Sequence, residues 1–282
     1  MSSNKERGQQ ALNSLEKELK ARDRKQKRGP WIVAAAAAVI ILAIAGGILY
    51  LATQPGDETV VADDETTAAP TPEQEDFQVL SMERNEALPE TVSCTYEETG
   101  EDSNGATVPP TDDVSTDGTV TVNLSTNQGE IGMELDRSVA PCTVNAVEHL
   151  ADEGFYDDTV CHRLTTSGLY VLQCGDPTGT GASGPGFEFP NEYPTDEAED
   201  TSSPIVYPRG SIAMANAGPD TNGSQFFLNY DDSPLQPNYT YFGQISEEGL
   251  ATLDSIAETG VQGGMGDGAP AEEVRIESAD VA

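Results

Sequence analysis

The chain has few basic residues outside its first 30 positions. Only 14 of its 282 residues are lysine or arginine, against 49 aspartates and glutamates. Nine of the 14 lie within residues 1–30, and the five that follow are all arginines. Beyond residue 30, five positive charges therefore face 45 negative ones, a formal net charge of −40. Because such a surface repels polyanions, the composition argues against a nucleic-acid partner.

Signals for several enzyme classes are also missing. The sequence contains no G-x-S-x-G motif, the turn that carries the nucleophile of many hydrolases. Gly179, Gly181 and Gly184 match G-x-G-x-x-G, but a strand or loop with two prolines follows where a dinucleotide fold needs a helix. Cys161 and His162 are adjacent, so in a strand they point to opposite faces, a poor geometry for a zinc site or a Cys–His nucleophile. We therefore expect no metal and no cofactor.

One long apolar run is present, at residues 31–52. Its 22 uncharged residues would make a helix of roughly 33 Å, enough for a hydrocarbon core of about 30 Å. A cleaved signal peptide is the competing interpretation, but its apolar region is usually about 7 to 15 residues long and its leading segment is short. We expect a single transmembrane helix. The basic segment 1–30 then places the N-terminus in the cytoplasm and the remainder outside the cell membrane.

The composition divides the remainder into three parts. Residues 53–77 are acidic, contain proline and threonine, and have few large apolar side chains, which is typical of a flexible, disordered linker. Residues 78–117 are loop-like but include several large apolar residues, and we interpret them as an extension packed on the domain. Residues 118–282 form the main domain.

All four cysteines lie on the predicted outer side, at Cys94, Cys142, Cys161 and Cys174. This distribution is typical of an oxidising compartment and predicts two disulfides, for which three pairings are possible. Cys161 and Cys174 flank a predicted hairpin around Gly168, and antiparallel strands would bring them together. Cys94 and Cys142 would then join the extension to the start of the first predicted helix.

Short strands dominate the pattern from residue 118 onward. Residues 119–126 and 130–136 alternate in polarity around a turn and predict a hairpin. Further strands are expected within 211–216, 224–230, 239–245 and 273–278, and helices at 142–155 and 249–260. Many short strands with two helices fit a mainly β domain, a closed antiparallel barrel capped at its ends.

Two blocks carry the most specific signal: FYDDTVCHRLTTSGLYVLQCGDPTGTGASGPGFEFPNE and GSIAMANAGPDTNGSQFF. They resemble the two signature blocks of the cyclophilins, the barrel-shaped peptidyl-prolyl cis/trans isomerases, and the first is similar in wording to membrane-anchored actinobacterial members. The resemblance implies a closed eight-stranded antiparallel barrel capped by two α-helices. The matching residues are Phe155, Tyr156, His162, Arg163, Gln173, Gly175, Asp176, Pro177, Met214, Ala215, Asn216, Gln225, Phe226 and Phe227.

The activity implied by the resemblance is rotation about the peptide bond that precedes proline. Its barrier of roughly 18 to 20 kcal/mol reflects the partial double bond, and no bond is made or broken. A site therefore needs only to stabilise the twisted amide, whose proline nitrogen can accept a hydrogen bond. The resemblance makes Arg163 the donor to that nitrogen and Gln173 the residue that holds it.

The substrate-binding residues are also implied by the resemblance. The chain has about two more residues between Arg163 and Gln173 than the usual family spacing, so Leu169, Tyr170 and Val171 compete for the same role. Tyr239 stands where many members have histidine. The expected binding residues are Tyr170, Val171, Ala215, Asn216, Gln225, Phe227, Leu235 and Tyr239.

Two hypotheses about function follow from these residues. The first is an isomerase with a monomeric catalytic domain, which is tethered to the membrane by one N-terminal helix. It would act on proline-containing segments of unfolded, exported or cell-envelope proteins. The second is a binding module or holdase chaperone that grips proline-containing segments with little isomerase activity. Retention of Arg163, Gln173 and Phe227 together favours the enzyme.

Overall fold

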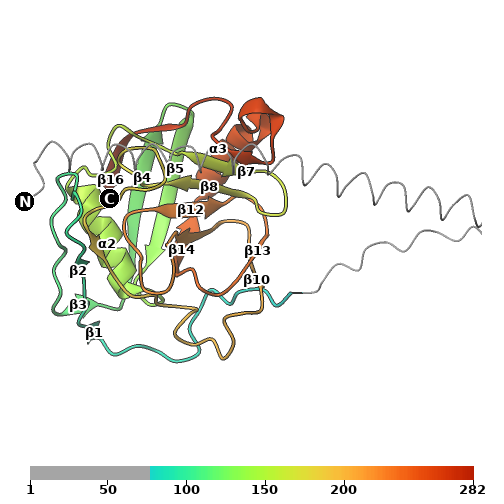
Figure 1. The fold of residues 1–282 in the computed structure, drawn as a ribbon. Coiled ribbons are helices and arrows are strands. Elements are labelled where there is room, and N and C mark those ends of the chain that lie inside the picture. Colours follow the sequence, from blue (N-terminus) through green and yellow to red (C-terminus); the bar gives the residue numbers. More distant parts are fainter. Residues whose placement is uncertain (1–76) are drawn as a thin grey trace, which may run out of the picture. The chain divides into compact units, whose positions relative to one another are not determined.

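The computed structural model describes residues 77–282 (Figure 1). The expected basic segment, the transmembrane helix and all but the last residue of the linker lie outside the described residues. Within residues 77–282, neither α-helix combines the length and the hydropathy that crossing a membrane requires.

A single curled sheet of ten antiparallel strands forms the body of the domain (Figure 1). Its hydrogen-bonded order is β15-β7-β8-β12-β11-β14-β5-β4-β16-β6. The strands are β4 (Thr119–Thr126), β5 (Gly129–Asp136), β6 (Thr159–Val160), β7 (Arg163–Thr165), β8 (Val171–Cys174), β11 (Ser211–Met214), β12 (Phe226–Asn229), β14 (Tyr241–Ile245), β15 (Asp267–Gly268) and β16 (Arg275–Val281).

The expectation of a closed eight-stranded barrel is wrong, because the sheet has ten strands and is open. In the described part of the chain, β15 and β6 end the hydrogen-bonded order, and no ladder joins them. Both are only two residues long, too short for the sequence to show alternation. Only Cys161 and His162 separate β6 from β7, so these strands lie within about 11 Å of each other although they belong to opposite ends of the order. The sheet therefore curls until its ends nearly meet.

Alternation of side chains along the strands builds the core. In the hairpin of β4 and β5, every second residue is buried, including Val122, Leu124, Ile131 and Met133. Leu164, Leu172, Leu228 and Ile212 lie opposite one another on four successive strands, and all are fully buried. This row fixes the inner face of β7, β8, β12 and β11.

Two α-helices pack on the sheet, as expected, although their bounds differ by a few residues. They are α2 (Pro141–Asp152) and α3 (Glu247–Thr259). Ser246 caps α3 by accepting a hydrogen bond from the Gly249 amide, and Gly260 ends it with a φ of 78°. At the start of α2, the Glu192 carboxylate accepts hydrogen bonds from the amides of Cys142 (3.1 Å) and Thr143 (2.8 Å). Burial raises the pKa of this carboxyl above its usual range.

Residues 77–117 pack against the rest of the domain (Figure 1). Three short strands lie here: β1 (Thr91–Val92), β2 (Glu97–Glu98) and β3 (Val114–Ser115). β1 pairs with β3, and β2 pairs with β9 (Phe187–Glu188) of the main domain. The Tyr96 ring packs edge-on against Phe187 and Phe189, with ring centroids 5.6 and 5.5 Å away, and its hydroxyl donates to the Cys142 carbonyl (2.7 Å).

The remaining pair is β10 (Ile205–Tyr207) with β13 (Ser233–Leu235). A single-turn 3-10 helix, Gln262–Gly264, precedes β15.

Two disulfides tie these parts together. Cys94 bonds to Cys142 and so links residues 77–117 to α2, and Cys161 bonds to Cys174 and so links the β6–β7 junction to β8. This is the pairing favoured by the predicted hairpin. No described cysteine is free.

The sequence separations of the two disulfides predict different contributions to stability. Cys94–Cys142 spans 48 residues and Cys161–Cys174 spans 13, so loop-closure entropy assigns them about 4 and about 3 kcal/mol respectively. We expect Cys94→Ser with Cys142→Ser to lower the free energy of unfolding of the full-length chain by up to about 4 kcal/mol, measured by urea titration with near-ultraviolet circular dichroism. An unchanged midpoint would show that residues 77–117 are not part of the cooperative unit.

Candidate active site

Strand register places three of the expected site residues in one row. Arg163 on β7 lies opposite Gln173 on β8, and Gln173 lies opposite Phe227 on β12. Directly opposed residues of antiparallel strands share a face of the sheet, and this is the face opposite the buried leucine row. The sheet therefore brings a cation, an amide and an aromatic ring together on its outer face.

The Arg163 guanidinium is held by an acid that the sequence analysis did not identify. Its Nε donates to Asp267 Oδ1 (2.8 Å), and its Nη2 donates to Asp267 Oδ2 (2.7 Å). Its Nη1 faces Gln173 Oε1 at 3.5 Å. The hydrogen bonds to Asp267 raise the pKa of Arg163, and those from Arg163 lower the pKa of Asp267. The side chain of Arg163 stays 41% exposed, so its remaining N–H groups are open to a ligand.

Asp267 reaches Arg163 because β15 pairs with β7, with Asp267 opposite Thr165. The only local sequence signal is that this acid stands alone in the glycine-rich stretch GGMGDGAP. Nothing in that stretch indicates a partner 104 positions away.

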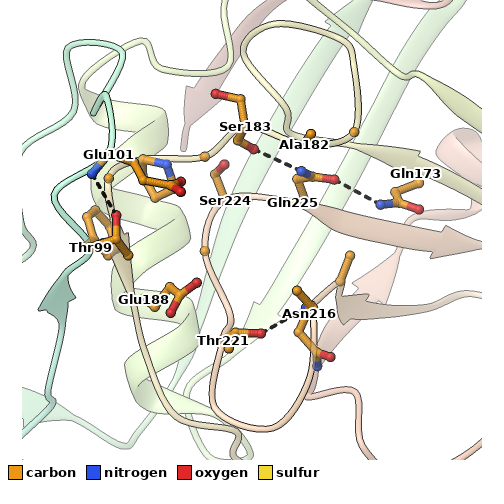
Figure 2. A pocket seen from close by; sticks show the side chains of 18 residues that line it. Thr99, Glu101, Gln173, Ala182, Ser183, Glu188, Asn216, Thr221, Ser224 and Gln225 are labelled. Atoms are coloured by element: carbon orange, nitrogen blue, oxygen red, sulfur yellow. Dashed lines mark hydrogen bonds between the residues drawn. The ribbon is translucent and has the colours of Figure 1, made fainter. Parts of the chain in front are cut away.

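A chain of amides continues from the row into a cavity (Figure 2). Gln173 Nε2 donates to Gln225 Oε1 (3.0 Å), and Gln225 Nε2 donates to the Ser183 carbonyl (2.9 Å). The cavity measures about 220 Å³, and Gln173, Ala215, Asn216 and Gln225 line it together. Four of the expected site residues therefore surround one hollow.

Ala215 and Asn216 also have partners within the domain. The Ala215 amide donates to the Gln225 carbonyl (2.9 Å), and Asn216 Nδ2 donates to the Asn238 carbonyl (2.9 Å). The Ala215 N–H is therefore already used within the domain and is not free to bind a substrate.

The apolar part of the site centres on Phe227, which is 5% exposed. Its ring meets Tyr239 edge-on with ring centroids 5.5 Å apart, and Tyr207 at 6.5 Å. The Tyr207 hydroxyl donates to the Tyr239 carbonyl (2.7 Å), which fixes this wall. Leu235 lies on β13 and packs half-buried against the core.

Tyr170 and Val171, two of the three residues that compete for one binding role, lie in different surroundings. Val171 lies two residues before Gln173 on β8 and so shares its face, although it is only 4% exposed. Tyr170 precedes the strand and packs edge-on against Tyr230 at 5.9 Å. Leu169 forms a bridge with Ser167 in the hairpin turn.

A second acid that holds the site in place is Asp176, which is fully buried. It accepts hydrogen bonds from the amides of Thr178 (2.6 Å), Ala182 (2.9 Å) and Ser183 (3.2 Å). Burial opposes ionisation, but these hydrogen bonds together lower the pKa of Asp176. The carboxylate thereby holds the loop that carries Ser183 against the cavity.

Residues that could hold a metal do not gather anywhere in residues 77–282. No group of three or more histidine, cysteine, aspartate or glutamate side chains has the required arrangement there.

Comparison with known proteins matches this region to one family. The family described as "Cyclophilin type peptidyl-prolyl cis-trans isomerase/CLD" matches residues 121–281. Two similar proteins are each named "Probable peptidyl-prolyl cis-trans isomerase B". The one from Mycobacterium tuberculosis is 56% identical over 177 residues, which cover 61% of this chain and 58% of that protein. The one from Mycobacterium leprae is 52% identical over 194 residues, which cover 66% of each.

A third similar protein, from Helicobacter pylori, is named "Peptidyl-prolyl cis-trans isomerase". It is 42% identical over 142 residues, which cover 50% of this chain and 82% of that protein. The alignments span less than two thirds of each mycobacterial relative. The family match covers more than half of this chain and includes the whole row of Arg163, Gln173 and Phe227, so the chain belongs to the cyclophilin-type peptidyl-prolyl cis-trans isomerase family.

Proposed function

We propose that this chain is a peptidyl-prolyl cis/trans isomerase that accelerates rotation about Xaa-Pro bonds. The observation that carries the proposal is the row of Arg163, Gln173 and Phe227 across three adjacent strands. A proline ring against Phe227 places its nitrogen beside the guanidinium. Catalysis then consists of binding the twisted amide more tightly than the planar one.

The geometry leaves Arg163 able to donate. A guanidinium carries five N–H groups. Asp267 takes one on Nε and one on Nη2, and one on Nη1 faces Gln173. One N–H on each terminal nitrogen therefore remains for the proline nitrogen, and the carboxylate fixes the plane in which both point.

Arg163 supplies only part of the required stabilisation. A hydrogen bond from a charged donor contributes about 1.5 to 3 kcal/mol, whereas an acceleration of about 100,000-fold needs roughly 7 kcal/mol. The apolar wall of Phe227 and Tyr239 supplies the remainder by excluding water from the amide, which disfavours its charge-separated planar form and strengthens the donor.

We further propose that the domain lies outside the cell, tethered by residues 31–52, and acts on exported or cell-envelope proteins. The 22-residue apolar run and the basic segment before it support a tether with a cytoplasmic N-terminus. The pairing of every described cysteine in a disulfide supports an oxidising compartment.

The first test separates an isomerase from a module that only grips proline segments. Arg163→Ala in the full-length chain should lower kcat by about 10- to 150-fold with little change in KM, because the lost donor acts on the twisted amide. A protease-coupled peptide assay measures both. Arg209→Ala, which removes an equally exposed arginine elsewhere, is the control. Equal rates for wild type and Arg163→Ala would favour the binding module.

The second test addresses Asp267 as a positioning residue. Asp267→Asn keeps the size of the side chain but removes its charge and one acceptor, so we expect kcat to fall about three- to tenfold while KM changes little. Arg209 and Asp254 form a similar two-bond pair, at 2.8 and 2.9 Å, with comparable exposure. Asp254→Asn is therefore the matched control. A loss of activity shared by both variants would indicate a general effect of charge or stability.

The third test concerns topology. In protoplasts that produce the full-length chain, added protease should remove a C-terminal tag and spare an N-terminal one, because the positive-inside rule keeps residues 1–30 in the cytoplasm. Immunoblotting of the two tags gives the result. Protection of the C-terminal tag would contradict the proposed location.

A further inference from the structure

Part of the apolar wall of the site lies outside the curled sheet. β10 and β13 form a separate pair in which Ile205 stands opposite Leu235, and in the described part of the chain no ladder joins this pair to the ten-stranded sheet. Leu235 on β13 is one of the expected binding residues. Tyr207 on β10 packs against Phe227, and its hydroxyl donates to the Tyr239 carbonyl. The register of the curled sheet therefore does not by itself place this part of the wall.

The first described residues of the chain run along the side of β10 that faces away from β13 (Figure 1). Val79 forms a parallel bridge with Val206. The Leu80 amide donates to the Val206 carbonyl (2.8 Å), and the Val206 amide donates to the Gln78 carbonyl (2.9 Å). Residues 78–80, here called the entry strand, are thus the third strand of a small sheet with β10 and β13.

Other contacts hold the entry strand itself in place. Leu80 is 5% exposed and belongs to the hydrophobic core. The Tyr193 hydroxyl donates to the carbonyl of Ser81, the next residue of the chain (2.6 Å). A hollow of about 610 Å³, lined in part by Leu80 and Ile205, lies beside the strand. Because side-chain packing is incomplete around this hollow, the two backbone hydrogen bonds to Val206 are a main support of the β10–β13 pair.

We propose that the entry strand is a positioning element of the isomerase site: by fixing β10, it holds Tyr207 and Leu235 in place around Phe227. This role rests on the proposed function. The entry strand acts through β10 and β13, and it precedes the residues 121–281 matched by the family. Loss of its support would loosen the contact with the proline ring and admit water to the amide, so the rate would fall although Arg163 is untouched.

The test compares Leu80→Pro with Val79→Pro in the full-length chain. Leu80→Pro removes the N–H that donates to Val206. Val79→Pro places the same residue type one position earlier, where the side chain is 57% exposed and the amide donates to no group within residues 77–282. For a proline peptide, we expect Leu80→Pro to lower kcat/KM about five- to tenfold. Val79→Pro should stay within about twofold of wild type. Near-ultraviolet circular dichroism checks that both variants are folded.

A double-mutant cycle with Leu235→Ala separates positioning from a general loss of stability. In the Leu235→Ala chain, Leu80→Pro should lower kcat/KM by less than about twofold, because the side chain that it positions is already gone. Leu250→Ala truncates another partly buried leucine, on α3, and in that chain Leu80→Pro should keep its full effect. Tyr193→Phe removes only the hydrogen bond to Ser81 and is a milder second variant, with an expected loss of about two- to threefold that also depends on Leu235.

Peptide affinities of the same chains, measured by fluorescence anisotropy, keep this role separate from the activity. A loss of affinity on Leu80→Pro that depends on Leu235, without isomerisation by the wild type, would support the entry strand and refute the activity. Isomerisation by the wild type, with losses for Leu80→Pro and Leu235→Ala that multiply independently, would overturn the entry strand and leave the activity standing.

An equal loss for Val79→Pro would also overturn the role of the entry strand, since the rigidity of proline and not the lost hydrogen bond would then be the cause. Should Leu80→Pro fail to fold, the cycle of Tyr193→Phe with Leu235→Ala decides. Independent losses in that cycle would overturn the proposal, and coupled losses would support it.

Discussion

The register of three antiparallel strands is the constraint on which the site depends. Leu164, Leu172 and Leu228 are fully buried on the inner face, and their chain neighbours Arg163, Gln173 and Phe227 therefore stand on the outer face. A shift of one residue would bury a guanidinium and expose a leucine. The burial of the leucines thus aligns the site without any contribution from the site itself. The Cys161–Cys174 disulfide reinforces this alignment at the end of β8.

Negative charge acts in two different ways around this row. Asp267 and Asp176 carry carboxylates whose hydrogen bonds are satisfied within the domain, and they orient a guanidinium and a loop. Glu101 and Glu188 face the cavity without a partner among the described residues. The first pair explains how the site is held still. The second pair leaves the lining of the cavity negatively charged.

The sequence predicted the features that arise from local pattern. Alternation gave the hairpin of β4 and β5, helical spacing gave α2 and α3, and the two signature blocks gave the row of Arg163, Gln173 and Phe227. It missed Asp267, because β15 has two residues and no periodicity, and its partner is distant in sequence. For residues 78–117, the sequence predicted only that they pack on the domain. Their place in the cavity depends on pairing between β2 and β9, two strands of two residues each, which no pattern reveals.

Because β2 pairs with β9, the cavity is lined by two separate parts of the chain. The row of Arg163, Gln173 and Phe227 belongs to the curled sheet. Part of the cavity wall, at Thr99 and Glu101, instead belongs to a segment that precedes the residues 121–281 matched by the family and follows the Cys94–Cys142 disulfide. Substitutions at Thr99 or Glu101 therefore change the lining of the cavity while Arg163, Gln173 and Phe227 keep their register.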